Sequence, residues 1–264
     1  MKVKIAGGDL CYDVRGRGPA ILFLHAFPLG LVMWDEQAAA LEATHQVVRF
    51  DYRGFGGSPA ADGILTMERI ADDAAALLDH LGISKAVVCG CSMGGYAAFA
   101  MVRRHADRLR GLVLADTRAG ADTEEARATR AVLGEKVRRE GPIAAAEAFL
   151  PKLVGETTKA ERTALVERLR GIILGNPASG IADALAGLSA RADSVPTLRE
   201  VRVPTLVVCG EEDVLTPLAE SEAIRRGVAG ARLEVVPKAG HLANIENPQA
   251  FNAALHSFLA TFAR

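Results

Sequence analysis

Ser92 lies at the centre of a Gly-x-Ser-x-Gly pattern that occupies residues 90–94. An apolar run, Ala86–Cys89, precedes this pattern directly, and an alanine-rich segment, Tyr96–Arg104, follows it. A tight turn between a strand and a helix projects a serine hydroxyl away from the sheet, and the two glycines let strand and helix approach each other. The turn also places the serine at a helix N-terminus, where unpaired N–H groups favour negative charge. The pattern therefore predicts that Ser92 is a nucleophile.

A serine hydroxyl is a weak nucleophile at neutral pH and needs a histidine or another base beside it. In the strand–turn–helix setting the acid and the histidine follow the serine along the chain. The histidines of the sequence are His25, His45, His80, His105, His241 and His256. Three of them precede Ser92, and the two at 105 and 256 belong to expected helices. Only His241, in a loop after the apolar run 233–236, fits the position of the base.

The acid that orients this histidine is expected after the preceding strand, residues 205–209. Three acidic residues compete there, since Glu211, Glu212 and Asp213 follow one another directly after Gly210. Asp116, at the end of the run 112–115, is a further candidate. The role of this acid is to fix the tautomer of the histidine and to stabilise its protonated form.

Two backbone N–H groups are expected to stabilise an oxyanion. One is the N–H of Met93, the residue after the nucleophile. The other is assigned to Phe27, in the loop that follows the strand 21–24, because Pro28 has no N–H to donate. The side chain of His25 is expected to brace this loop and not to take part in catalysis.

The elements that must position these residues alternate between strands and helices. Short apolar runs that predict buried strands are Ala20–His25, Val47–Phe50, Ala86–Cys89, Leu112–Ala115, Thr205–Cys209 and Leu233–Val236. Residues 67–81 have helical periodicity and stop at Gly82, and residues 247–262 predict a closing helix with Asn247 as its N-cap. This alternation is typical of a mostly parallel, doubly wound α/β sheet covered by helices on both faces.

The alternation stops between residues 117 and 196, where no convincing strand occurs. About four helices are expected there, separated at Gly141-Pro142, at Gly155 and at Asn176-Pro177. An all-helical insertion between two strands of one sheet predicts a lid. The expected organisation is thus a core of residues 1–116 and 197–264 with a helical lid of residues 117–196.

Composition narrows the classes of partner. The chain has 264 residues and a formal net charge of −1, which gives no electrostatic reason to expect nucleic acid or an anionic membrane. Residues 1–14 lack the apolar core of a signal peptide, and the most apolar stretch, 20–34, is shorter than the ~20 residues of a membrane span. A cytoplasmic protein is therefore expected. The four cysteines form no CxxC pair, so neither a disulfide framework nor a zinc site is expected.

The motifs together resemble those of α/β-hydrolases of the 3-oxoadipate enol-lactonase, aryl-esterase and cofactor-free haloperoxidase-like group. The resemblance covers nearly the whole chain outside the lid and rests on residues 25–28, 33–34, 50–58, the Ser92 turn, residues 210–213, 240–241 and 245–248. It implies the α/β-hydrolase fold, an eight-stranded sheet with an inserted lid. The family spacing Gly-x-x-Asp selects Asp213 as the acid. The resemblance also implies that Asp51 and Arg53 brace loops near the site. One departure is Ala26, where the family usually has glycine, so the oxyanion loop is expected to differ slightly in shape.

The expected function is that of a serine carboxylic-ester hydrolase, which acts on small esters or lactones through an acyl-enzyme and needs no metal or organic cofactor. Ser92 argues against the related dehalogenases and epoxide hydrolases, since these carry aspartate at the turn. Two alternatives stay open. One is an enol-lactonase or carbon–carbon bond hydrolase that acts on a carboxylate-bearing substrate, and the other is a ligand receptor on a hydrolase fold. Whether the chain forms a homo-oligomer is left open.

The lid is expected to decide which substrate is accepted. Its only aromatic residue is Phe149. The aliphatic candidates for roofing a pocket are Leu133, Val137, Ile143, Leu150, Leu153, Ile172, Ile173 and Leu185. A carboxylate-bearing lactone would require at least one inward-pointing arginine, and the candidates are Arg118, Arg127, Arg130, Arg138, Arg139, Arg162, Arg168, Arg170 and Arg191.

Overall fold

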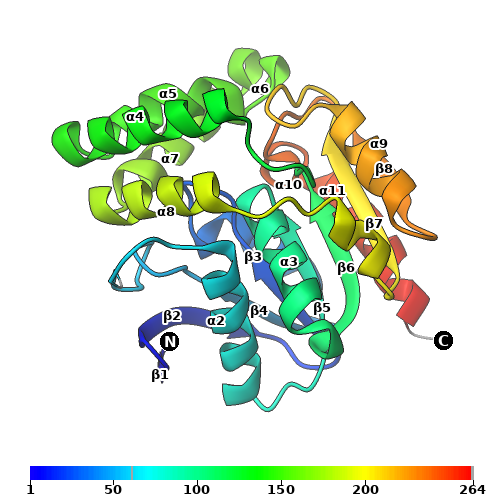
Figure 1. Cartoon of the computed structure of the whole chain (residues 1–264). Coiled ribbons are helices and arrows are strands. Elements are labelled where there is room, and N and C mark those ends of the chain that lie inside the picture. The colour runs from blue at the N-terminus through cyan, green and yellow to red at the C-terminus, as the bar shows by residue number, and fades with distance from the viewer. Residues whose placement is uncertain (61, 263–264) are drawn as a thin grey trace.

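An eight-stranded sheet runs through the protein in the order β1-β2-β4-β3-β5-β6-β7-β8 (Figure 1). The computed structural model describes residues 1–60 and 62–262. The strands are β1 (Lys2–Ile5), β2 (Gly8–Arg15), β3 (Ala20–Leu24), β4 (Gln46–Phe50), β5 (Ala86–Cys91), β6 (Leu109–Ala115), β7 (Thr205–Gly210) and β8 (Arg232–Val236). The pairs β1–β2 and β2–β4 are antiparallel, and every other pair is parallel. The predicted α/β-hydrolase sheet is thereby confirmed.

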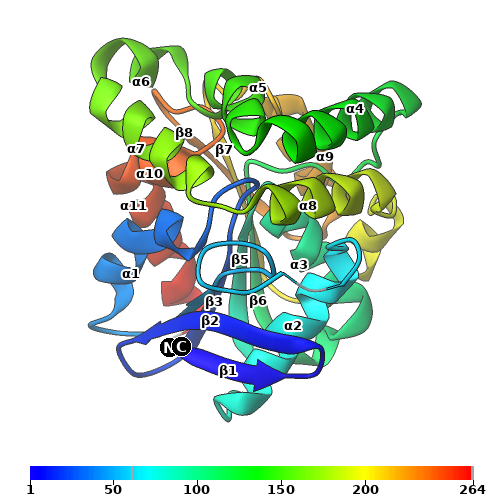
Figure 2. The same cartoon turned by 90° about the vertical axis from the view of Figure 1, so that its left-hand side faces the viewer.

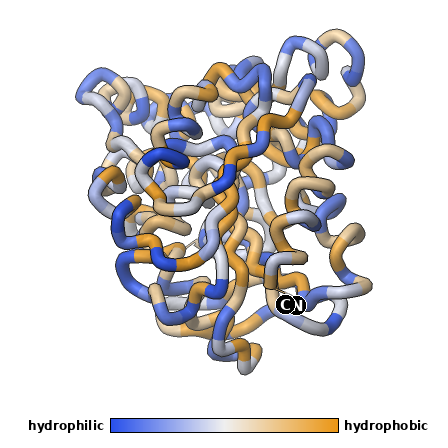
Figure 3. Tube along the Cα trace, turned by 90° about the vertical axis from the view of Figure 1, so that its right-hand side faces the viewer, coloured by the Kyte–Doolittle hydropathy of each residue, from blue (hydrophilic) through white to orange (hydrophobic). Residues whose placement is uncertain are grey.

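The central strands are the parts of the sheet that the sequence predicts most directly. All residues of β3, β5 and β7 are buried, because helices cover both faces and each strand is apolar on both sides. In Figure 3 orange stretches of chain run through the middle of the molecule, and blue stretches are found mostly towards its outside. The hairpin of β1 and β2 has no such apolar run, since its charged residues face solvent at the edge of the sheet.

Helices flank the sheet in two groups (Figure 2). The helices α2 (Met67–His80), α3 (Met93–Arg104) and α9 (Leu218–Gly227) cover one face, and α1 (Asp35–Leu41) and α11 (Pro248–Leu259) cover the other. The predicted caps are found where expected. The side chain of Asn247 accepts a hydrogen bond from the N–H of Ala250, with Pro248 as the first residue of α11.

Five α-helices lie between β6 and β7, where about four were expected. They are α4 (Glu124–Glu140), α5 (Ile143–Leu153), α6 (Glu156–Glu161), α7 (Thr163–Leu174) and α8 (Ala178–Ala190). The additional break falls at Arg162, whose backbone leaves the helical region at φ −133° and ψ 53°. No glycine or proline marks this break. The Arg162 guanidinium donates to the carbonyl of Glu246, a contact across the fold that local sequence does not reveal.

The five helices, called the insertion below, lie together at one end of the sheet in both views (Figures 1 and 2). A short 3₁₀ helix, η3 (Pro196–Glu200), leads from the insertion back to β7. The lid function and the boundaries at residues 117 and 196 stay predictions. Among the described residues, no helix combines the length and the apolar character that crossing a membrane requires.

Candidate active site

Ser92 occupies a strained turn between β5 and α3. Its backbone angles are φ 53° and ψ −112°, a combination that L-residues adopt only when the surroundings impose it. The two glycines of the pattern make the turn sterically feasible. A Cβ on Gly90 would lie 2.2 Å from the carbonyl oxygen of Gly94, and a Cβ on Gly94 would lie 2.1 Å from that of Leu24. Strand and helix therefore pack at a distance that only glycine permits, with the half-buried serine between them.

The structure brings Ser92, His241 and Asp213 into one hydrogen-bonded line. The Ser92 Oγ is 2.7 Å from Nε2 of His241, and Nδ1 of the same ring is 2.8 Å from Oδ2 of Asp213. The carboxylate can only accept at neutral pH, so Nδ1 carries the proton and Nε2 accepts from the serine hydroxyl. This is the arrangement in which a histidine removes a proton from serine.

The Asp213 carboxylate is held by groups from its own loop. Its Oδ1 accepts from the backbone N–H of Leu215 and of Thr216, and its Oδ2 accepts from the Thr216 hydroxyl at 2.6 Å. Burial by itself would raise the pKa of Asp213, but the charge and hydrogen bonds of His241 and Thr216 outweigh burial and lower it. The carboxylate therefore stays ionised beside the imidazole.

The competing acids lie elsewhere. Asp116 is fully buried and accepts from the N–H groups of Gly210 and Ala243, at 2.7 and 3.3 Å, and it makes no hydrogen bond to His241. Burial and the nearby Asp213 charge raise the pKa of Asp116 well above its usual value. Glu212 binds Thr157 of the insertion, and Glu211 accepts from the N–H of Lys238. Asp213 is thus the only one of the four in contact with the imidazole.

The two expected oxyanion donors both line the cavity above Ser92. The first hydrogen bonds of α3 run from Gly95 and Tyr96 to the Ser92 carbonyl, which leaves the N–H of Met93 without a helical partner. Within the described residues, the N–H of Phe27 also has no protein acceptor, since the nearest loop bonds use the N–H of Ala26 and of Leu29. Both N–H groups are therefore available to a ligand.

His25 braces the loop that carries Phe27, as predicted. Its Nδ1 donates to the carbonyl of Ala26 at 3.0 Å, and its Nε2 accepts from the N–H of Tyr52 at 3.1 Å. Complete burial lowers the pKa of His25 to about 3, so the ring is neutral. Ala26 is not among the residues with a positive φ, so its Cβ fits this loop without backbone strain.

The loop of residues 51–58 is tied down as the resemblance implies. The Asp51 carboxylate accepts from the N–H groups of Leu31 and Gly57, at 2.7 and 2.9 Å. Arg53 makes two hydrogen bonds of 2.7 Å to Asp73 on α2. Both side chains are buried and belong to the scaffold of the site.

The cavity beside Ser92 has a volume of about 60 Å³. Its roof comes from the insertion: Phe149 and Leu153 of α5, Leu188 of α8 and Arg130 of α4. Leu153 was among the predicted roof residues, whereas Leu188 was not. Of the arginines considered, Arg118 and Arg130 line this cavity.

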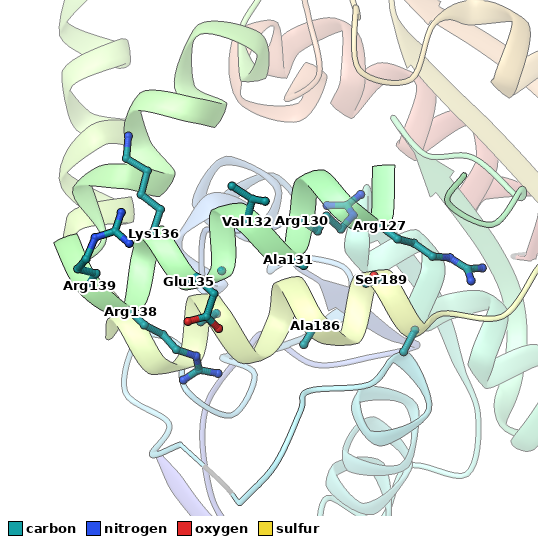
Figure 4. A pocket seen from close by; sticks show the side chains of 13 residues that line it. Arg127, Arg130, Ala131, Val132, Glu135, Lys136, Arg138, Arg139, Ala186 and Ser189 are labelled. Atoms are coloured by element: carbon teal, nitrogen blue, oxygen red, sulfur yellow. The ribbon is translucent and has the colours of Figure 1, made fainter. Parts of the chain in front are cut away.

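A larger groove of about 870 Å³ lies on the outer side of the insertion, between α4 and α8 (Figure 4). It includes Arg127, Val132 and Arg138 but none of the three residues of the hydrogen-bonded line. Size alone would select this groove as the site. The chemistry selects the small cavity, because the hydrogen-bonded line of Ser92, His241 and Asp213 lies beside it.

The side chains of Asp116, Cys209 and Asp213 place one potential metal ligand each within 4.8 Å of one another. These donors do not suit a metal. Burial raises the pKa of the Cys209 thiol to about 12, and the oxygens of both carboxylates already accept hydrogen bonds from protein groups. No metal site is inferred from this cluster.

Glu246 supports the site through its hydrogen bonds, a role that the sequence did not predict. Its Oε1 accepts from the N–H of Gly240 and of Leu242, on either side of His241, and its Oε2 accepts from the N–H of Gly155 in the insertion. The position of this glutamate just before Asn247-Pro248 was part of the family resemblance. Its contacts required the fold.

The order of the strands, the turn that carries Ser92 and the loop that carries His241 together define a hydrolase with the α/β-hydrolase fold. Residues 19–248 match the alpha/beta hydrolase fold family, so the chain belongs to this family. The resemblance inferred from the motifs is confirmed.

Similar proteins include esterases and enol-lactonases. A 3-oxoadipate enol-lactonase 2 from Acinetobacter baylyi is 32% identical over 249 residues, which cover 92% of this chain and 90% of that enzyme. The structure of a thermophilic esterase from Thermogutta terrifontis, with malate bound, is 40% identical with a TM-score of 0.97 and covers 99% of this chain and 98% of that one. The enol-lactonase from Burkholderia xenovorans LB400 is 32% identical with a TM-score of 0.92, with 98% of this chain and 100% of that one covered.

Proposed function

We propose that this hydrolase cleaves small carboxylic esters or lactones through an acyl-enzyme formed on Ser92. The observation that carries the proposal is the line of two short hydrogen bonds from Asp213 through His241 to Ser92. Esters and lactones are favoured as the substrate class because three relatives of 32–40% identity are an esterase and two enol-lactonases.

The reaction follows from this line. The Ser92 Oγ attacks the substrate carbonyl carbon while Nε2 of His241 takes its proton, and the N–H groups of Met93 and Phe27 stabilise the oxyanion. The protonated His241 then gives its proton to the departing alkoxide. Water attacks the acyl carbon next, His241 removes its proton, and Ser92 leaves with that proton as the free acid forms.

The cavity limits the size of the acyl group. The cavity beside Ser92, of about 60 Å³, is small and has its roof in the insertion, so a long acyl chain would fit only if this roof moved. Short acyl chains are therefore the preferred substrates of the proposed reaction. For a lactone the leaving alcohol stays attached to the acyl group, and the product is a hydroxy acid.

The experiment compares the wild-type protein with Ser92→Ala on p-nitrophenyl acetate and a simple lactone. We expect Ser92→Ala to lower kcat by at least about 10³-fold, in line with the loss of a serine nucleophile elsewhere. A fluorophosphonate probe should label Ser92 in the wild type. Ser84→Ala, which changes an exposed loop serine, is the matched control and should keep full activity.

Three results would count against the proposal. Absence of turnover with every ester and lactone, together with an unlabelled Ser92, would favour a ligand receptor. Cleavage of a carbon–carbon bond between two carbonyl groups, with no ester turnover, would favour a carbon–carbon bond hydrolase. Equal activity of Ser92→Ala and the wild type would remove Ser92 from the reaction.

A further inference from the structure

A buried carboxylate beside the cavity holds three arginines. The side chain of Asp122 is fully buried, and its Oδ1 lies 3.0 Å from Arg118 and 2.6 Å from Arg191. Its Oδ2 accepts from Nε of Arg130 at 2.6 Å. Burial alone would raise the pKa of Asp122, but the hydrogen bonds and charges of Arg130 and Arg191 outweigh it and lower the pKa. The carboxylate is thus ionised and fixes the guanidinium groups in place.

Arg191 is occupied by the fold itself. Besides its ion pair with Asp122, it donates to the carbonyls of Gly120 and Leu188, at 2.7 and 3.2 Å. Its guanidinium lies 4.3 Å from the ring centre of Tyr96, which lines the cavity. Arg191 therefore supports the cluster from behind and is not free to bind a ligand.

Arg118 and Arg130 differ from Arg191 because they line the cavity together with Ser92 and His241. Each donates to Asp122 through a single nitrogen, and, against the effect of burial, a hydrogen bond to the Tyr96 side chain also raises the pKa of Arg118. The Nε of Arg118 is buried and has no hydrogen-bond partner in the described part of the chain. A buried donor without a partner is unfavourable, so these groups have capacity for an incoming acceptor.

The charges around the cavity favour an anion. Three guanidinium groups surround one carboxylate, which leaves an excess of two positive charges. No aspartate or glutamate is among the described residues that line the cavity. The planar guanidinium group of arginine matches the planar geometry of a carboxylate. Hydrogen bonds between the two groups are strong where water is largely excluded.

We propose that Arg118 and Arg130 form a carboxylate-binding subsite beside Ser92, so that the preferred substrates are short esters or lactones that themselves carry a carboxylate. This inference rests on the proposed function and names its substrate class. Asp122 and Arg191 position the two arginines and do not touch the substrate.

A second cavity adjoins the proposed subsite. A groove of about 370 Å³ on the outside of the insertion shares Arg130, Phe149 and Leu215 with the cavity beside Ser92, and Lys152 lies in it. These three side chains line both cavities, and Glu125 lies in the groove as well.

The test compares a charged ester with a neutral ester of the same shape. Monoethyl succinate carries a carboxylate where ethyl 4-methylpentanoate carries an isopropyl group. For the wild type we expect kcat/KM to be at least 10-fold higher for the charged ester. In Arg118→Gln and in Arg130→Gln the ratio of the two kcat/KM values should fall by about 10- to 100-fold, the range for loss of a charge-assisted hydrogen bond.

Arg127→Gln is the matched control. Arg127 lies on the same helix as Arg130 and is exposed, but it does not line the cavity beside Ser92 (Figure 4). This variant should keep the wild-type ratio. Arg118→Lys, which keeps the charge and loses the planar fork, should retain part of the preference. Arg118→Lys also tests the subsite if one of the glutamine variants does not fold.

Succinate binding to the unreacted protein, measured by calorimetry, separates this inference from the proposed function. Binding that is weakened in Arg118→Lys but not in Arg127→Gln supports the subsite even if no ester is hydrolysed. Hydrolysis of both esters with equal kcat/KM would overturn the subsite and leave the proposed function standing. A ratio that stays unchanged in both glutamine variants, or no succinate binding by the wild type, would overturn it as well.

Discussion

Two buried carboxylates close to His241 differ in charge because their partners differ. Asp213 accepts hydrogen bonds from a hydroxyl, from backbone groups and from the imidazole, and its pKa is lowered although burial opposes ionisation. Asp116 has only backbone partners and lies close to the Asp213 charge, so burial and repulsion raise its pKa. One carboxylate is therefore suited to support a protonated histidine, and the other holds the loops that carry Asp213 and His241.

Exchange of each carboxylate for an amide separates these roles. In Asp213→Asn the amide oxygen is expected at the Oδ1 position, where it accepts from the N–H groups of Leu215 and Thr216. The NH2 group then faces Nδ1 of His241 and donates to it, which favours the tautomer that is unable to take the serine proton. We expect kcat for ester hydrolysis to fall by about 10⁴-fold, the loss seen for this exchange in serine proteases. Asp116→Asn should lower kcat by less than about 10-fold, since Asp116 does not contact the imidazole. Equal losses in the two variants would contradict this assignment.

The neutral His25 ring predicts a dependence of stability on pH. The unfolded chain binds the His25 proton near pH 6.5, but the folded chain binds it only near pH 3. Between these values the unfolded state takes up more protons, so the free energy of unfolding decreases as the pH is lowered, by up to about 1.4 kcal/mol per pH unit. The part of the free energy of unfolding that depends on a neutral His25 ring is therefore complete above pH 6.5, and it is lost as the pH falls towards 3.

Urea unfolding at pH 7, 6 and 5 measures this effect. The wild type should lose stability faster on acidification than His25→Gln, which has no titrating ring at this position. The amide variant is less stable at pH 7, so the comparison concerns the slope and not the absolute value. Parallel slopes for the two proteins would show that His25 is not buried in its neutral form.

The turn at Ser92 shows why a Gly-x-Ser-x-Gly pattern in the sequence goes together with close packing in the fold. The turn is so tight that no side chain fits at Gly90, and α3 approaches β3 so closely that none fits at Gly94. The strained angles of Ser92 persist because both flanking elements are buried and fix the turn from either side. A short motif therefore carries information about the packing of two whole elements.

Gly94→Ala tests this close packing. The new Cβ would lie 2.1 Å from the carbonyl oxygen of Leu24, a backbone atom of β3 that cannot move without disturbing the central sheet. We expect the free energy of unfolding to fall by more than about 2 kcal/mol, the scale of overpacking in a core. The measurement is thermal or urea unfolding.

Gly171→Ala is the control on another helix. Gly171 lies in the interior of α7, and a Cβ there would have no neighbour within 4 Å. The alanine should raise the free energy of unfolding by about 0.5–1 kcal/mol through helix propensity. Destabilisation by both exchanges to a similar extent would mean that the loss at Gly94 is not a matter of steric fit.

At the scale of the whole molecule, the insertion is attached to the core close to the catalytic loops. Gly155 and Gly240 approach so closely that a Cβ on Gly240 would lie 2.3 Å from the nitrogen of Gly155. Glu246 accepts from both of these N–H groups, and Glu212 accepts from Thr157 at the start of α6. The attachment of the insertion and the position of His241 thus depend on the same carboxylate.

Glu246→Gln should weaken both functions of this carboxylate. The amide keeps one accepting oxygen, so at least one of the three N–H groups loses its partner, at a cost of about 1–3 kcal/mol in the free energy of unfolding. We expect kcat to fall by about 10-fold or more, because the loop on either side of His241 is less well fixed. Urea unfolding and ester hydrolysis measure the two effects.

The control for this variant is Glu211→Gln. Glu211 is exposed and accepts only from the N–H of Lys238, at 3.1 Å. Its exchange should change stability by no more than about 0.5 kcal/mol and leave kcat at the wild-type value. If Glu246→Gln behaved like this control, Glu246 would have no part in placing His241.

The sequence by itself determined the features that depend on local residue order. Apolar runs predicted the parallel strands β3 to β8, of which β8 is a half-buried edge strand, the glycine spacing predicted the serine turn, and the order of residues pointed to His241. These predictions succeed because a strand buried on both faces must be apolar throughout, and because a turn this tight admits only glycine beside the serine.

Only the tertiary structure decided which distant groups meet. Asp213 stands beside two other acidic residues in the sequence, and it alone of the three reaches His241 in the fold. Nine arginines between residues 117 and 196 were candidates for the pocket, but only Arg118 and Arg130 line the cavity with Ser92. Such choices depend on how elements far apart in the chain pack against one another, and the local pattern of any one element does not contain that information.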